Sequence, residues 1–213
     1  GASHPRTWHD FRGFPAALHQ VRYPARGLPE MAKSLMTELN GVGIDTRLDT
    51  GRALDHGIWS PLSLLWPQAD VALIPASVPM QVDTATQLKT AASLGRWAEA
   101  NDIMLIGSGA ATHNLGDRHL VHDAPDAWAR RFHEWIIDVA ARGDLDAIKD
   151  WRHVTNARYA HPTPEHFLPL LICVGAMERQ PLQALHESFM FGNLSMLALG
   201  SEALTQRLDN TVA

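Results

Sequence analysis

Short, mainly apolar runs alternate with helix-like stretches along this chain. The clearest runs lie at residues 71–75, 103–107 and 194–199, each close to a proline or a glycine. Unbroken apolar character is typical of strands that are covered on both faces, as in a parallel sheet. Residues 44–48 instead alternate in polarity, which indicates a strand nearer the edge of the sheet.

The stretches between these runs have the 3.6-residue periodicity of amphipathic helices. The pattern predicts helices at residues 29–39, 84–100 and 127–141. A fourth helix is predicted to begin at Thr163, with Thr163 as the N-cap and Pro164 at the first helical position. Strands that alternate with helices predict an α/β fold with a mainly parallel central sheet flanked by helices.

The length of 213 residues predicts one domain that spans residues 1–213. The chain begins with polar, turn-like sequence and no opening strand, whereas α/β domains commonly begin with a buried strand. We therefore expect a single domain that is incomplete at its N-terminus and lacks its first strand–helix–strand portion.

The composition of the chain excludes some classes of partner and cellular location. Lysine and arginine total 18 against 23 for aspartate plus glutamate, and the resulting net charge of −5 argues against nucleic-acid binding. A single cysteine, Cys173, excludes an internal disulfide and indicates a reducing compartment. No apolar run reaches the roughly 18 residues of a membrane span, and no signal peptide is visible. These features predict a soluble, cytoplasmic protein that binds neither nucleic acid nor a membrane.

Three histidine-bearing segments suit a functional site. His113 follows the apolar run at 103–107 in a glycine-bearing loop, and ligand-binding loops of open α/β sheets gather at such strand ends. His56 follows Asp55, which could orient its imidazole. Residues 161–166 form the third segment. Each context also fits an ordinary structural role, such as a turn histidine or a helix cap, so none is decisive alone.

Two of the motifs carry further chemistry. Residues 161–166 read His-Pro-Thr-Pro-Glu-His, which places Glu165 in the first turn of the predicted helix. The helix dipole favours an ionised carboxylate there, and such a carboxylate is available as a metal ligand. Residues 8–15 read Trp-His-Asp-Phe-Arg-Gly-Phe-Pro, a mixture that suits a pocket for an aromatic small molecule.

Taken in order, these segments resemble a known family. The motifs are His-Asp-Phe-x-Gly-Phe-Pro at 9–15, Asp-His-Gly at 55–57, His-Asn-Leu at 113–115, His-Pro-Thr-Pro-Glu-His at 161–166 and Gly-Asn-Leu-Ser-Met at 192–196. Their order and context resemble the DODA-type extradiol aromatic ring-opening dioxygenases. That family belongs to the class III, protocatechuate 4,5-dioxygenase β-subunit-like superfamily. The resemblance runs from about Ala2 to Leu199.

The resemblance implies a non-haem Fe(II) enzyme that opens a catecholic ring with O₂, with Zn(II) found in place of iron in some members. It assigns Glu165 and His166 to the metal. It assigns His113 to acid–base chemistry or to a further metal contact. His56 is implied to act near the substrate and O₂, and His9 and Asp10 are implied to line the substrate pocket.

The family's two N-terminal metal histidines lie in His-Gly-Ser-Pro and Ser-Ala-His-Trp motifs, which do not occur in this sequence. We therefore expect this chain alone to bind Fe(II) or Zn(II) weakly or not at all. The alternative from another class is a metal-free, non-catalytic binding or interaction protein that retains the dioxygenase fold. A metal-dependent hydrolase is a more distant alternative. The expected partners of the enzyme are a small catecholic substrate and O₂, with a homo-oligomer also open.

Overall fold

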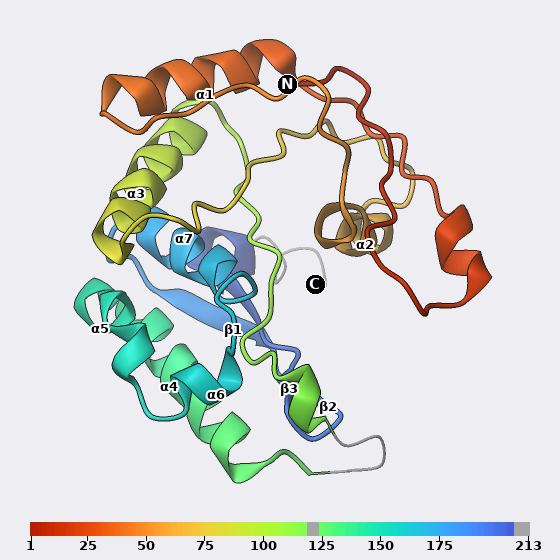
Figure 1. The fold of residues 1–213 in the computed structure, drawn as a ribbon. Coiled ribbons are helices and arrows are strands. Elements are labelled where there is room, and N and C mark those ends of the chain that lie inside the picture. The colour runs from red at the N-terminus through yellow and green to blue at the C-terminus, as the bar shows by residue number, and fades with distance from the viewer. Residues whose placement is uncertain (119–123, 207–213) are drawn as a thin grey trace. The chain divides into compact units, whose positions relative to one another are not determined.

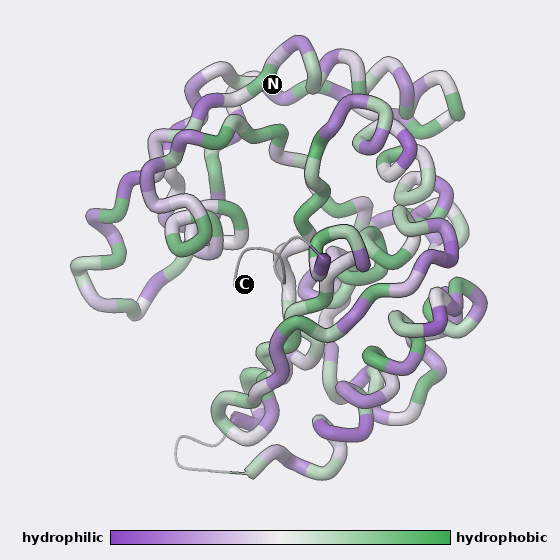
Figure 2. Tube along the Cα trace, turned by 180° about the vertical axis from the view of Figure 1, so that it is seen from behind, coloured by the Kyte–Doolittle hydropathy of each residue, from purple (hydrophilic) through white to green (hydrophobic). Residues whose placement is uncertain are grey.

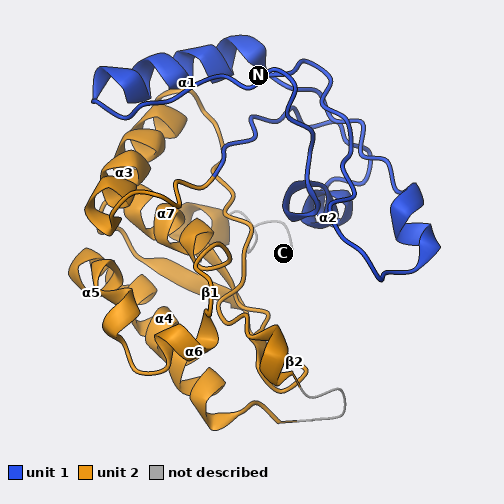
Figure 3. Cartoon of the chain, viewed as in Figure 1, with its two compact units in different colours: residues 1–77 blue, residues 78–213 orange. Residues whose placement is uncertain are grey.

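The structure is a computed structural model that describes residues 1–118 and 124–206. The chain divides into two compact units, which we call unit 1 (residues 1–77) and unit 2 (residues 78–213), as Figure 3 shows. The prediction of one domain over residues 1–213 stays a prediction. No helix in the described part of the chain is long and apolar enough to cross a membrane.

Unit 1 is built mainly from irregular chain that packs around a small core. Its helical elements are η1 (Ala16–Gln20), α1 (Pro29–Gly41) and α2 (His56–Leu65). Helix α1 begins with a proline, which suits the first turn because the missing N–H would have no partner there, and it buries Leu35 and Leu39. A cluster around Tyr23, Leu54 and Trp59 forms the core of the unit.

Two isolated parallel bridges hold the irregular segments of unit 1 together. One joins Thr7 to Leu54, and the other joins Gly27 to Leu73. The second bridge involves the predicted strand at 71–75, but the pairing does not extend into a ladder.

Unit 2 contains most of the regular structure (Figure 1). Its helices are α3 (Thr84–Ala100), η2 (Leu115–Asp117), α4 (Ala127–Arg142), α5 (Leu145–Lys149), η3 (Trp151–His153), α6 (Ala157–Ala160) and α7 (Leu168–Ala176). Its strands are β1 (Leu182–His186), β2 (Phe189–Met190), β3 (Leu194–Ser195) and β4 (Ala198–Ser201).

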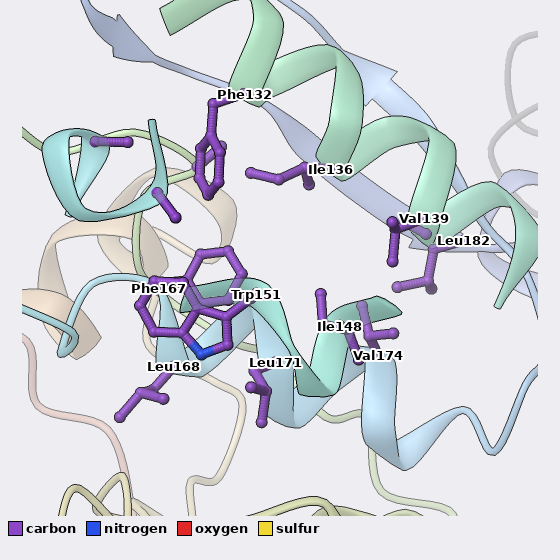
Figure 4. Close-up of a cluster of buried hydrophobic side chains, with 14 residues drawn as sticks. Phe132, Ile136, Val139, Ile148, Trp151, Phe167, Leu168, Leu171, Val174 and Leu182 are labelled. Atoms are coloured by element: carbon purple, nitrogen blue, oxygen red, sulfur yellow. The ribbon is translucent and has the colours of Figure 1, made fainter. Parts of the chain in front are cut away.

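The core of unit 2 lies where α4, α5 and α7 meet (Figure 4). Trp151 and Phe167 stack with ring centroids 4.1 Å apart, and Phe132 from α4 packs beside Phe167. This aromatic cluster matters for the site because Phe167 directly follows the predicted metal-ligand pair.

Helices α3 and α7 pack closely against each other through glycines. A Cβ atom on Gly95 would lie 2.3 Å from the carbonyl oxygen of Ala176, and one on Gly175 would lie 2.7 Å from the Cβ of Ala91. Because Gly95 and Gly175 have no side chain, the two helices can pack at this short distance.

The prediction of a mainly parallel central sheet is not confirmed. The described chain has two sheets of two strands each, and both are antiparallel: β1 pairs with β4, and β2 pairs with β3. Three of the predicted strands, at 44–48, 71–75 and 103–107, are not strands, and the predicted run at 194–199 contains β3 and the start of β4. The fold is therefore mixed α/β with small sheets.

The run at 103–107 shows why the prediction failed. It extends as a hydrophobic segment after α3 (Figure 2), but it has no strand partner within the described residues. Met104 and Ile106 are 54% and 45% exposed, whereas the prediction required cover on both faces. An apolar run indicates that a segment is hydrophobic, but a strand forms only where a second strand lies beside it and shares backbone hydrogen bonds.

Three of the predicted helices are confirmed, and the fourth begins later than predicted. Residues 29–39, 84–100 and 127–141 form α1, α3 and α4 with nearly the predicted bounds. The helix expected from Thr163 instead begins at Leu168, after a turn in which the N–H groups of Phe167 and Leu168 both donate to the Pro164 carbonyl. Pro169 has no N–H, so a regular helical ladder cannot run through this point.

Candidate functional site

In unit 2 the structure brings together three residues that the sequence assigned to the site. The imidazole rings of His113 and His166 stack with centroids 3.5 Å apart and planes within 10° of parallel. Nδ1 of His166 lies 3.3 Å from Oε1 of Glu165. These three side chains come from two loops that are more than 50 residues apart in the sequence, so the fold and not local sequence creates the group.

Backbone hydrogen bonds join the two loops. The N–H of Ala110 donates to the His166 carbonyl at 2.9 Å, and the N–H of His113 donates to the Ala160 carbonyl at 2.9 Å. Between them, Nε2 of the buried His161 lies 2.9 Å from the Ala111 carbonyl and donates to it. Three hydrogen bonds within four residues therefore fix the His113 loop on the 160–166 segment.

Close backbone approach explains the glycines of the loop. A Cβ atom on Gly109 would lie 2.3 Å from the carbonyl oxygen of His166, and one on Gly107 would lie 2.7 Å from that of Pro169. Any side chain at these positions would push the His113 loop away from His166 and from the first turn of α7.

His113 and Glu165 both have shifted pKa values. Burial lowers the pKa of His113 below the usual value for histidine, and the neighbouring His166 lowers it further, while Glu165 partly opposes the shift. Partial burial raises the pKa of Glu165, but a hydrogen bond of 2.6 Å from the Thr163 hydroxyl, a backbone hydrogen bond and the neighbouring His166 outweigh it, so that the net pKa is lowered. At neutral pH the site therefore pairs a neutral His113 with an ionised Glu165.

His161 is a residue that the sequence placed in a motif without giving it a role. Its side chain is 4% exposed, and burial lowers its pKa to about 4 despite the hydrogen bond to Ala111. The ring is thus neutral and holds the loop by donating from Nε2. The Pro-rich motif was a signal for this residue, but its partner 50 residues away was not readable from the sequence.

The donor types around His166 suit a metal ion, but the geometry does not complete a site. Nδ1 of His166 is buried and makes no hydrogen bond with any described residue, and it lies beside a carboxylate. Within the described ranges, however, no group of three or more histidine, cysteine, aspartate or glutamate side chains could hold a metal ion. The residues present therefore supply part of a donor set and do not by themselves fit Fe(II) or Zn(II).

In unit 1 the predicted residues His56 and Asp10 form a second group. Oδ1 of Asp10 accepts from Nδ1 of His56 at 2.9 Å and from the His56 backbone N–H at 3.1 Å. Partial burial raises the pKa of Asp10, but these hydrogen bonds outweigh it and lower the net pKa. A carboxylate that accepts from Nδ1 leaves Nε2 of a neutral His56 as the acceptor atom.

The partner of His56 differs from the expected one. We expected the adjacent Asp55 to orient the imidazole, but the Asp55 carboxylate binds Arg52 at 2.9 Å. Asp55 is the N-cap of α2 and has an extended backbone, so its side chain points away from that of the next residue. The partner Asp10 instead comes from the His-Asp-Phe motif, 46 residues earlier.

Aromatic rings surround His9 and His56 in unit 1. The His9 ring lies 5.6 Å from that of Trp59 and 6.0 Å from that of Phe11, and Phe11 lies 6.1 Å from His56. The sequence singled out residues 8–15 as suited to an aromatic ligand, but it did not identify Trp59, which comes from α2. His9 itself is fixed because Nε2 donates to the Val21 carbonyl at 3.0 Å.

A cavity of about 440 Å³ adjoins this group within unit 1. Its wall includes His9, Arg6, Arg22 and the buried Tyr23. The volume is within the range of small-molecule sites, and the basic side chains suit an acidic group on a ligand.

The sequence as a whole is similar to a family of oxygen-using enzymes. Residues 2–199 match the family described as the catalytic LigB subunit of aromatic ring-opening dioxygenase. A 4,5-DOPA dioxygenase extradiol of Beta vulgaris is 35% identical over 192 residues, which cover 89% of this chain and 71% of that protein. The 4,5-DOPA dioxygenase extradiol of Escherichia coli K12 is 32% identical over 200 residues, which cover 92% of this chain and 73% of that protein.

A solved structure shows the same likeness in three dimensions. A crystal structure of an uncharacterized Escherichia coli K12 protein superposes with a TM-score of 0.74 at 27% sequence identity. The superposition covers 92% of this chain and 80% of that one.

Proposed function

The chain belongs to the family of catalytic LigB subunits of aromatic ring-opening dioxygenases, and from this premise we propose that it is an extradiol ring-cleavage dioxygenase that acts on a catecholic substrate with O₂. The observation that carries the proposal is the stacked pair of His113 and His166 beside Glu165. This group combines a neutral base, a second imidazole and a carboxylate. Ring opening of a catechol requires that its hydroxyl protons move, and such a group suits that task.

His113 is the proposed acid–base residue. Since burial and the neighbouring His166 lower its pKa, its imidazole is unprotonated at neutral pH and can accept the proton of a substrate hydroxyl. The same ring, once protonated, can return the proton to the ring-opened product. His166 packs against the face of His113 and limits how far the ring can turn.

Glu165 and His166 are the proposed metal-contacting residues, and His113 is a further possible contact. The family is generally metal-dependent, and Fe(II), with Zn(II) as a substitute, is the proposed metal. Because the described residues form no complete donor set, we expect the purified chain to hold metal well below stoichiometry after dialysis, which metal analysis would measure.

His9, Asp10 and His56 are the proposed substrate-side residues. Asp10 fixes the ring of His56 by two hydrogen bonds, and aromatic contacts fix His9. Rigid imidazoles among aromatic rings suit a planar substrate, because the rings stack and the nitrogen atoms give direction.

Oxygen uptake tests the proposal. The chain, supplied with excess Fe(II), should consume O₂ with catechols but not with resorcinols, whose hydroxyls are not adjacent. His113→Ala should lower the turnover rate roughly 10²–10⁴-fold, the usual loss for one acid–base group. The matched control is His153→Ala, which removes an exposed histidine of the same unit and should leave the rate unchanged. Equal rates for the wild type and His113→Ala would refute the assigned role.

A further inference from the structure

The loop that carries His113 is also held from its other side, by the turn that precedes and enters β3. The hydroxyl of Thr112 donates to the Asn193 carbonyl at 2.6 Å and accepts from the Ser195 N–H at 2.7 Å. The amide of Asn193 donates to the Asn114 carbonyl at 3.0 Å. The two residues that flank His113 are therefore both bonded to residues 193–195, which we call the clamp turn.

These hydrogen bonds lie in the interior of unit 2. Thr112 and Asn193 are both 0% exposed, and Ser195 is 3% exposed. Water cannot replace a broken bond at such positions without entering the interior, so each bond resists loss. His113 itself is half-buried between these two anchored neighbours.

A buried histidine outside the proposed site holds the clamp turn in place. Nε2 of His133 on α4 lies 3.1 Å from the Glu187 carboxylate, which can only accept, so Nε2 donates. Nδ1 of the same ring is hydrogen-bonded to the Ser195 hydroxyl at 2.8 Å. The N–H of Asp126, at the start of α4, donates to the Gly192 carbonyl at 2.7 Å. Helix α4 thus anchors the clamp turn through Ser195, and its N-cap residue Asp126 holds Gly192, the residue directly before the clamp turn.

We propose that Thr112 is a positioning residue, whose hydroxyl holds the backbone at His113 on the clamp turn and so keeps the His113 imidazole stacked on His166. The proposal rests on the proposed function, since the placement of His113 affects a reaction only if His113 takes part in it. A series of hydrogen bonds runs from Glu187 through His133 and Ser195 to Thr112, which directly precedes His113. Thr112 is the member nearest to the proposed acid–base residue.

Two substitutions at Thr112 separate its hydrogen bonds from its bulk. Thr112→Val has almost the same shape but neither donates nor accepts, so the Asn193 carbonyl and the Ser195 N–H lose their buried partner. Thr112→Ser keeps the hydroxyl. The stability control is Val139→Ala, which removes bulk from the core of unit 2 without changing the clamp.

The first readout is the nuclear Overhauser effect between the ring protons of His113 and His166, which needs no substrate. Wild type, Thr112→Ser and Val139→Ala should all show it, and Thr112→Val should lose it. The second readout is oxygen uptake, in which Thr112→Val should lower kcat roughly tenfold to a hundredfold, with a smaller change in KM, and Thr112→Ser should restore it.

The two readouts distinguish failure of the positioning role from failure of the proposed reaction. If the wild type consumes no O₂ while Thr112→Val loses the ring contact, the positioning role holds and the proposed reaction is wrong. If Thr112→Val keeps the ring contact, or Val139→Ala at equal thermal stability loses it, the positioning role is wrong. If Thr112→Val does not fold, Asn193→Ala, which removes the hydrogen bond to Asn114 on the other side of His113, tests whether the clamp turn holds the His113 loop and should weaken the ring contact.

Discussion

At the scale of the residue, the site depends on imidazoles that burial keeps uncharged. His161 is only 4% exposed, and it donates one hydrogen bond that holds the His113 loop. A charged ring there would have to lose its hydration without gaining a carboxylate partner, which explains why its pKa falls to about 4. The same cause, in weaker form, lowers the pKa of His113.

Stability should therefore fall in mild acid. In the unfolded chain His161 takes up a proton near pH 6.5, whereas in the folded chain it does so only near pH 4. Between these values the unfolded state binds more protons, so the free energy of unfolding decreases as the pH falls, by about 3 kcal/mol from this residue. Below pH 4 both states are protonated and its contribution becomes constant.

Urea unfolding between pH 7 and pH 4 measures this effect. His161→Gln keeps a donor for the Ala111 carbonyl but does not titrate in this range, so its stability should fall less steeply than that of the wild type. His153→Gln, which removes an exposed histidine of unit 2, is the matched control, and the effect of His161→Gln should exceed it. Identical pH profiles for the wild type and His161→Gln would contradict the account.

At the scale of the element, the helices were predictable and the strands were not. Helices α1, α3 and α4 form from local periodicity, and each residue's hydrogen-bond partner is four positions away. The runs at 71–75 and 103–107 have strand-like composition, but a ladder requires a neighbour that the sequence does not identify. The start of α7 was predicted too early because the effect of Pro169 outweighed the capping signal at Thr163.

The close packing of α3 on α7 makes a prediction at this scale. Gly95→Ala and Gly175→Ala should each lower the free energy of unfolding by about 1–3 kcal/mol, because the added Cβ atoms overlap Ala176 and Ala91. Alanine favours a helix more than glycine does, so a loss would show that crowding dominates. Gly41→Ala at the end of α1, where a Cβ atom would meet nothing within 4 Å, is the control and should cause no loss. Urea denaturation measures all three, and no loss for Gly95→Ala would contradict the packing.

At the scale of the whole molecule, the partners of the residues that the sequence assigned to the site could not be predicted from the sequence. The fold places the His113 ring against that of His166, which lies beside Glu165, and the roles assigned to these three residues stay predictions. Pairs distant in sequence were missed: Asp10 with His56, His161 with Ala111, and Thr112 with Asn193. Such pairs depend on how loops meet, which composition and periodicity do not encode.

The central claim is that this chain opens a catecholic ring with both atoms of O₂ and uses His113 to move protons. The most direct measurement is mass spectrometry of the product formed by the chain with excess Fe(II), a catechol and O₂ labelled with a heavy oxygen isotope. The account predicts a ring-opened product that carries both labelled oxygen atoms, formed at a much lower rate by His113→Ala. A product with one labelled atom or none, or no product at all, would contradict it.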